Sequence, residues 1–415
     1  MTDLVLIALA ALTGTGIACY LFLRRAAYSV LDPVLLLSAF IAFGAPLLSV
    51  LCAAGTVPWS KFALFAAVLL AYLAGARTAV RKFQRIEFRK SLVEATADFS
   101  RSEIQAILVL TISFTLLLAT LGILFGAAGD ARQQFGRTFR PLLLLHQGLF
   151  LFSLVLLLSR KFSWSRAMTW AIVMALLAIP FSGKSVLVPV IYWTGLRLYV
   201  VGRRVTFRTA TISMAIGILS VALMGVIAYG KASLGGVFLL LGYRLWLSGD
   251  IYIYAYQLHG LAALRGHYDV SFIPYMLHPI TALVGIRAYD RPLGAALASQ
   301  ISGAEVLTGP NPILPVLLDF FFPGSTAAAA GVAFVIGYLV IGLRPLAIAL
   351  QRCRARFLRT GALVAAIFAP APGFLDTSQV LMSIVAIAGI VFAGMMADLL
   401  LRGPFTRTAE AHPAP

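Results

Sequence analysis

The chain is poor in charged residues, and poorest in acids. Only 12% of its 415 residues are Asp, Glu, Lys or Arg, whereas soluble proteins carry about 25%. Its three cysteines include no CxxC pair, so they give neither a disulfide framework nor a zinc-binding pattern. The shortage of charge accompanies 61% hydrophobic residues and a mean hydropathy of +0.95. This composition excludes a soluble domain and predicts an all-α, polytopic integral membrane protein.

The sequence also lacks a complete nucleotide-binding loop. The stretch "PFSGKSVLVP", residues 180–189, contains the Gly-Lys-Ser that closes a P-loop, but Ala178 stands where the motif needs its first glycine. The run before it is too long and too apolar for the strand that feeds such a loop. We therefore expect no ATPase, and place Lys184 in a tight turn on the outer face.

Runs of roughly 17 to 25 apolar residues cross a bilayer as helices. The sequence contains about eleven such runs, near residues 3–23, 31–53, 60–76, 104–125, 142–159, 167–182, 186–201, 209–229, 325–343, 358–372 and 379–401. They divide the chain into an N-terminal eight-helix region (1–229), one large external loop or cap (230–324) and a C-terminal three-helix region with a cytoplasmic tail (325–415).

Every second connection between these runs is basic. Of the 33 Lys and Arg residues, 23 fall on one side and 10 on the other. Because cytoplasmic connections carry the excess of Lys and Arg, the N-terminus is expected outside and the C-terminus in the cytoplasm. The net charge of +18 is thus explained by topology, and no nucleic acid is expected as a partner.

Two of the basic inner segments, 77–103 and 344–357, mix arginine with apolar residues. This mixture is typical of helices that lie on a membrane surface. Ser102 and Gln105 have the spacing of a capping box at the start of the helix that follows the first segment.

The ten outer basic residues are exceptions to the rule that Lys and Arg stay on the cytoplasmic side. This makes them better candidates for function than the inner ones. Arginine offers a rigid fork of donors that matches phosphate oxygens, so several converging arginines can hold a diphosphate without metal. The alternative is that they are solvated loop charges or anchors to lipid phosphates. The candidates for an anion site are Arg132, Arg137, Arg140, Lys184, Arg244, Arg287 and Arg291.

The external loop supplies further candidates. "YRLWLSGDIYIYAYQLHG" places Asp250 just before Tyr252 and Tyr254, and aromatic faces with carboxylates suit sugars, although tyrosines also form interfacial belts. "GPNPILPVLLDFFFPG" contributes Asn311 and Asp319, the latter either functional or structural.

The external histidines show no compact metal-ligand spacing, so no metal and no cofactor are expected. His278 remains a candidate acid or base, and a structural histidine is the alternative.

These residues resemble the bacterial oligosaccharide repeat-unit polymerases of the O-antigen (Wzy) type. The resemblance covers roughly residues 180–345 and rests on the turn at Lys184, the loop opening "YRLWLSGDIYIY", and "GPNP" followed by "LLDFFFPG". Many relatives carry arginine at the position of Lys184. The family implies a GT-C-like fold in the bacterial inner membrane, with chain-length regulators and flippases as protein partners.

The resemblance also implies a reaction, namely metal-independent inverting glycosyl transfer between sugar chains on undecaprenyl diphosphate at the periplasmic face. Arg244 and the arginines at 132–140 and 287–291 would stabilise the leaving diphosphate. Asp250 would accept the proton of the attacking hydroxyl, with Asp319 and His278 as alternatives.

Two other functions remain open. An O-antigen ligase would use the same donor and differ only in its acceptor. A lipid-linked oligosaccharide flippase would transport rather than react, but it should have short outer loops, and the loop at 230–324 is long.

Overall fold

The computed structural model describes residues 2–29, 31–125, 135–136, 138–182, 187–203, 211, 249–306, 309–370, 372–374 and 377–402. All regular secondary structure within these ranges is helical. Five helices are long and apolar enough to cross a membrane: α1 (Thr2–Leu23), α3 (Trp59–Ala79), α5 (Arg101–Leu124), α17 (Thr326–Ala349) and α19 (Thr377–Arg402). The expected all-α membrane fold is confirmed in this coarse form.

The predicted number of eleven spans is not established. Other predicted spans also fall on apolar helices: α2 (Pro33–Ala53), α7 (Arg140–Leu156), α8 (Trp164–Ser182), α9 (Leu187–Val201) and α18 (Arg356–Phe368). Apart from Thr211, the predicted span at 209–229 lies outside the described residues.

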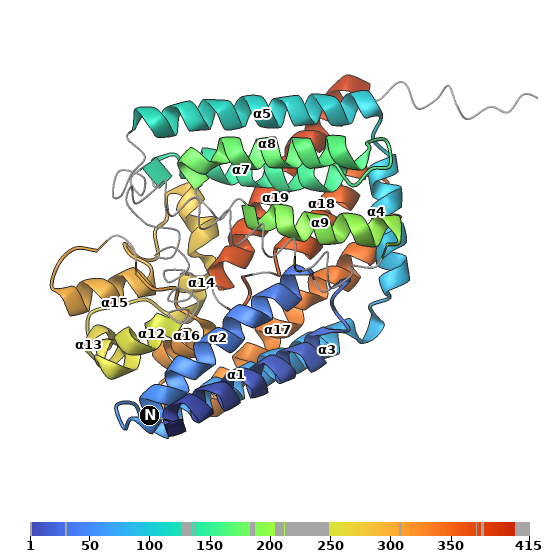
Figure 1. Cartoon of the computed structure of the whole chain (residues 1–415). Coiled ribbons are helices and arrows are strands. Elements are labelled where there is room, and N and C mark those ends of the chain that lie inside the picture. The colour runs from blue at the N-terminus through green and yellow to red at the C-terminus, as the bar shows by residue number, and fades with distance from the viewer. Residues whose placement is uncertain are drawn as a thin grey trace, which may run out of the picture.

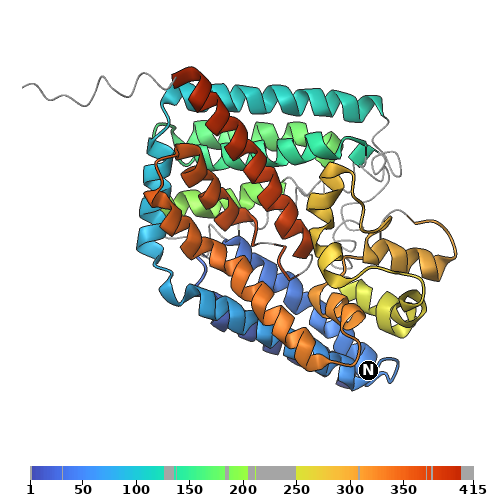
Figure 2. The same ribbon diagram turned by 180° about the vertical axis from the view of Figure 1, so that it is seen from behind.

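The helices pack around two hydrophobic cores. The first is built by α1, α2, α3 and α17, and the second by α5, α7, α8, α9, α18 and α19. Figures 1 and 2 show α5, α7 and α8 running side by side in the second group, with α17 lying along α3 in the first. Phe83 and Leu343 pack against both cores and so join the two groups.

The closest helix contact in the first group, between α3 and α17, depends on glycine. A Cβ on Gly75 would lie 2.0 Å from the carbonyl oxygen of Phe334, and one on Gly337 would lie 2.1 Å from that of Tyr72. Only residues without side chains allow two backbones to approach this closely, which is how helices commonly pack in lipid.

A buried ion pair fixes the start of α2 to the second half of α17. Asp32 is the N-cap of α2, and its carboxylate accepts hydrogen bonds from the N–H groups of Tyr28 and Val34 at 2.8 and 2.9 Å. The guanidinium of Arg344 donates to both carboxylate oxygens, at 2.8 and 2.7 Å. Both side chains are fully buried.

The structure corrects two expectations. The capping box of α5 is formed by Ser100 and Glu103 rather than by Ser102 and Gln105, because the helix starts at Arg101. Segment 344–357 is not a surface helix, since its first six residues continue α17 and α18 starts at Arg356.

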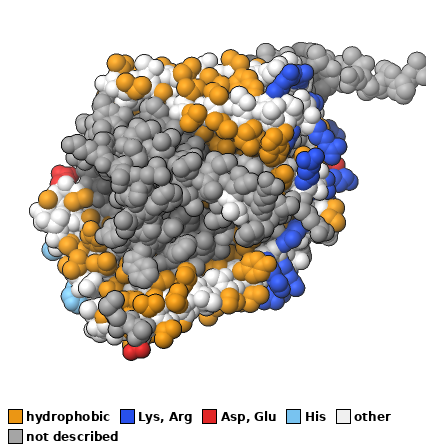
Figure 3. Space-filling model, viewed as in Figure 1, with side chains coloured by type: hydrophobic (Ala, Val, Ile, Leu, Met, Phe, Trp, Pro, Cys, Tyr) orange, Lys and Arg blue, Asp and Glu red, His pale blue; other side chains and the backbone are white. Residues whose placement is uncertain are grey.

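Helix α4 (Arg85–Ala97), in the first predicted surface segment, crosses one end of the bundle (Figure 1) and buries Phe88 and Leu92. Lys and Arg side chains gather at this end, which we call the basic edge (Figure 3). Its exposed members include Arg24, Arg25, Arg77, Arg81, Arg85, Lys90, Arg101, Arg352 and Arg354.

At the opposite end, the described part of the external loop folds into short helices (Figure 1). They are α12 (Asp250–Tyr252), followed by a π turn (Ile253–Gln257), α13 (Gly260–Arg265), α14 (Phe272–Thr281), α15 (Leu293–Ser302) and α16 (Leu314–Phe321). Leu293 and Leu314 are fully buried in the first core, so this part is packed onto the bundle.

Candidate functional site

Three of the five described outer cations are neutralised by carboxylates. Lys61 of α3 lies 2.7 Å from Asp319 on α16, and the guanidinium of Arg265 lies 3.7 Å from the same carboxylate. Arg265 also donates to the backbone oxygen of Asp319 at 2.6 Å. Arg291 pairs with Glu305 at 2.7 Å. These contacts hold α3, α13 and α16 together and fasten the two ends of the α15 segment.

The other two, Arg140 and Arg287, form no ion pair within the described part of the chain. Both act on His278 of α14. Burial lowers the pKa of His278 below its ordinary value of 6.5, and the positive charges of Arg140 and Arg287 lower this pKa further. We call these three residues the His278 cluster.

The turn after α14 fixes the His278 ring. Gly285 takes a left-handed conformation, with φ of 83°, and reverses the chain so that the N–H of Ala288 donates to His278 Nδ1 at 3.2 Å. Tyr289 stacks on the imidazole, with ring centroids 3.8 Å apart. The ring is buried. The stacking on Tyr289 fixes its orientation, and the hydrogen bond from Ala288 fixes Nδ1 as an acceptor.

The hydrogen bond at Nδ1 also determines which ring nitrogen carries the proton. A neutral imidazole that accepts at Nδ1 carries its hydrogen on Nε2. His278 in this form donates from Nε2, as an oxyanion site requires, and cannot accept a proton there. The geometry therefore favours hydrogen-bond donation over the general-base role.

Arg140 lies where three helices meet. It is the first residue of α7, and its guanidinium approaches the thioether sulfur of Met382 on α19 at 3.8 Å. Helix α14 packs against α19 as well, which brings His278 to the same junction. Arg140 is half-buried, whereas Arg287 is exposed beyond the turn at Gly285. Their positive charges therefore act on His278 from one half-buried and one exposed position.

The other predicted residues lie elsewhere. Asp250 starts α12, which packs against α2, and is half-buried. Tyr252 is fully buried and packs edge-on against Phe65, so it belongs to the first core. Tyr254 is half-buried and Asn311 is exposed.

Asp319 forms no hydrogen bond or ion pair with the His278 cluster among the residues described. Its carboxylate is occupied by Lys61 and Arg265, which is the arrangement of a structural anchor. Arg132, Arg137, Lys184 and Arg244 lie outside the described residues.

Sequence reasoning did not single out the partners of these groups. Lys61 is one of the ten outer basic residues, but nothing in its sequence surroundings indicates a pair with an acid 258 positions away. Asp32 followed by Pro33 is an N-cap pattern that the sequence itself contains. Within the described part of the chain, no three His, Cys, Asp or Glu side chains gather to hold a metal ion.

Fold and site together define an all-α membrane protein with a cationic cluster at the end of the bundle opposite the basic edge. Comparison with family models, curated proteins and solved structures found no match to this chain. The resemblance to the O-antigen polymerase family accordingly rests on the sequence alone.

Proposed function

We propose that the protein is a polysaccharide polymerase of the bacterial inner membrane, which joins undecaprenyl-diphosphate-linked oligosaccharides at the periplasmic face. The observation that carries the proposal is the His278 cluster, in which two cations with no carboxylate partner among the described residues act on a neutral imidazole N–H donor. Such a group of donors suits an anion, and the reaction produces one when the lipid diphosphate leaves.

In this mechanism the chain's own residues stabilise developing negative charge. As the bond between the anomeric carbon and the diphosphate breaks, Arg140 and Arg287 supply positive charge and His278 donates from Nε2. The acceptor hydroxyl attacks the anomeric carbon with inversion, and Asp250 is assigned to accept its proton. Because Asp250 lies on α12, this assignment requires the substrate to extend from the His278 cluster to α12. Asp319 is assigned a positioning role instead, because its ion pair with Lys61 joins α16 to α3.

The test is complementation of a deletion strain, with surface polysaccharide separated on a gel. Arg287→Ala should reduce polymerisation by about 10²-fold or more, because one preplaced donor in such a site contributes that much. The matched control is Arg101→Ala, which removes an exposed arginine from the basic edge and should leave the ladder unchanged. Immunoblotting of membranes checks that both variants accumulate.

The deletion strain itself separates the proposed function from its alternatives. A polymerase deletion should leave a single core-plus-one-repeat band in place of a ladder. Loss of every repeat would contradict the proposal, and would indicate a ligase if unattached glycan collects outside and a flippase if it collects in the cytoplasm. A normal ladder from Arg287→Ala would remove Arg287 from the site.

A further inference from the structure

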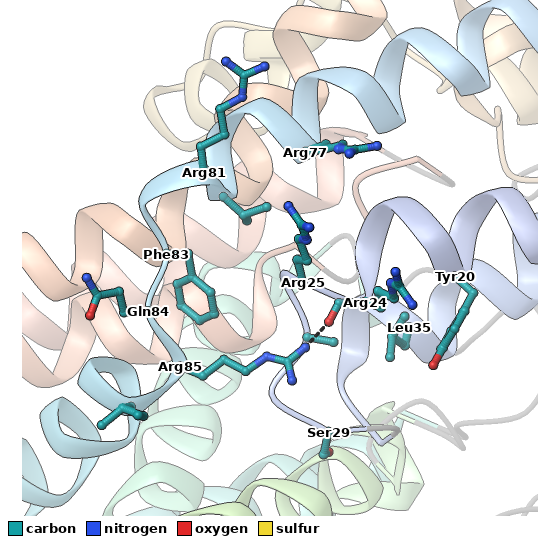
Figure 4. Close-up of a pocket in the computed structure, with 13 residues that line it drawn as sticks. Tyr20, Arg24, Arg25, Ser29, Leu35, Arg77, Arg81, Phe83, Gln84 and Arg85 are labelled. Atoms are coloured by element: carbon teal, nitrogen blue, oxygen red, sulfur yellow. Dashed lines mark hydrogen bonds between the residues drawn. The ribbon is translucent and has the colours of Figure 1, made fainter.

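A cavity of about 1040 Å³ opens at the basic edge, far along the chain from the His278 cluster. It lies between the end of α1, the connection to α2, the end of α3 and the start of α4. Figure 4 shows Arg77, Arg25 and Arg85 reaching it from three of these elements. The arginines among its described lining residues are Arg24, Arg25, Arg77, Arg81 and Arg85.

The described lining residues include no acid, and none of these five arginines has a carboxylate partner in the part of the chain that the structure describes. Arg85 donates to the carbonyl oxygen of Arg24, and Arg77 lies 5.4 Å above the ring of Phe22. All five side chains are exposed. Five like charges around one space repel each other, and a bound anion relieves that repulsion.

Apart from Ser29 and Gln84, the other described lining residues are apolar or aromatic. Leu35, Phe83, Tyr20 and Ile86 share the cavity with the arginines. Ile86 is 84% exposed and Tyr20 is 53% exposed, which is the exposure of side chains that face lipid. A site with guanidinium groups beside apolar side chains at the bundle end fits an amphiphile rather than a purely polar solute.

We propose that this cavity binds the phosphate headgroup of an anionic phospholipid from the leaflet at the basic edge. By the charge distribution this is the cytoplasmic leaflet. Guanidinium forks bind phosphate oxygens in pairs, so five arginines match a headgroup with two phosphates better than one with a single phosphate. The volume exceeds what one inorganic phosphate fills. This inference does not depend on the proposed glycosyl transfer.

Native mass spectrometry of the purified full-length protein tests the inference directly. The protein is titrated with cardiolipin, with phosphatidylglycerol and with phosphatidylcholine, and separately with inorganic diphosphate. Arg25→Gln combined with Arg81→Gln removes two cavity charges and leaves the Arg85 and Arg77 contacts intact. The control is Arg352→Gln with Arg354→Gln, which removes equal charge from exposed positions on the same edge.

The wild-type protein should bind cardiolipin more tightly than phosphatidylglycerol, and phosphatidylcholine least. The cavity variant should bind cardiolipin at least about 10-fold more weakly, since each arginine near an anionic headgroup contributes roughly 5-fold. The control variant should bind as the wild type does. Equal loss in both variants would overturn the inference, because the effect would then be general surface charge. Tight binding of diphosphate without lipid preference would equally overturn the lipid assignment.

Discussion

At the scale of single residues, the structure separates the described outer charges that have a carboxylate partner from those that have none among the described residues. Lys61, Arg265 and Arg291 have carboxylate partners, and such pairs stabilise the packing of the external segment. Arg140 and Arg287 instead face an imidazole whose pKa they lower. Two cations beside His278 disfavour its protonated form, and the same cations would stabilise a bound anion. This is the reason to place the chemistry at the His278 cluster.

The low pKa of His278 predicts how stability depends on pH. Because this pKa is lower in the folded chain than in the unfolded one, the unfolded chain binds the proton first as the pH falls below 6.5. Stability should therefore be full above pH 6.5 and decline as the pH falls from there toward the folded-state pKa. His278→Asn should flatten this decline in the thermal unfolding midpoint, measured in detergent between pH 7.5 and 5. His267→Asn, at an exposed position, should keep the wild-type slope. Parallel slopes for all three proteins would show that His278 does not titrate as described.

The buried pair of Arg344 and Asp32 makes a second prediction. Removing only one partner leaves a charge buried without compensation, which costs about 3–5 kcal/mol. Arg344→Met should accordingly lower the unfolding midpoint strongly or prevent accumulation. The double variant Asp32→Asn with Arg344→Met buries no charge and should recover much of the loss. A double variant less stable than the single one would mean that the N-cap carboxylate matters more than the ion pair.

At the scale of helices, the sequence predicts where elements lie much better than how they meet. Apolar runs of suitable length locate α1, α3, α5, α17 and α19, because the hydrocarbon thickness fixes helix length. In lipid, however, an apolar helix face can contact either a neighbouring helix or acyl chains. Hydropathy therefore does not predict which helices pack against each other.

The wrong expectation for segment 344–357 and the limits of the site prediction share this cause. The basic pattern of segment 344–357 predicts that Arg344 lies in an inner connection, yet its partner is a buried acid 312 positions away. His278 could be chosen as a candidate by residue type. The hydrogen bond from Ala288 that determines its tautomer depends on the turn at Gly285, which residue type does not reveal.

The contact between α3 and α17 can be tested with two glycines of the same helix. Gly337→Ala places a Cβ about 2 Å from the backbone oxygen of Tyr72, so the helices must separate. Gly342→Ala meets no atom within 4 Å and should be neutral, or stabilising by about 0.5–1 kcal/mol through helix propensity. We expect the first variant to lower the unfolding midpoint by several degrees and the second to raise it slightly. Equal effects would indicate that α3 and α17 do not cross at Gly337.

At the scale of the whole molecule, charge is divided between two ends. The exposed arginines and lysines of the basic edge lie at one end of the helices, and α12 to α16 lie at the other (Figures 1 and 3). Since positively charged connections remain in the cytoplasm, the His278 cluster is expected at the periplasmic face and the arginine-lined cavity at the cytoplasmic one. The proposed polymerisation needs this orientation, because the lipid-linked repeat units would be joined outside, whereas for the proposed phospholipid site the orientation decides only which leaflet supplies the lipid.

Cysteine labelling in intact cells tests this orientation. Replacing Cys19, Cys52 and Cys353 by alanine or serine gives a background without thiols, into which Ala304→Cys or Glu87→Cys is introduced at an exposed position. A membrane-impermeant maleimide should label the cysteine at 304, beside α15, in spheroplasts. It should label the one at 87, on α4, only after the membrane is opened. Because the two positions lie at opposite ends of the bundle, the reverse pattern would place the His278 cluster in the cytoplasm. That result would rule out periplasmic polymerisation at this site and would move the lipid cavity to the outer leaflet.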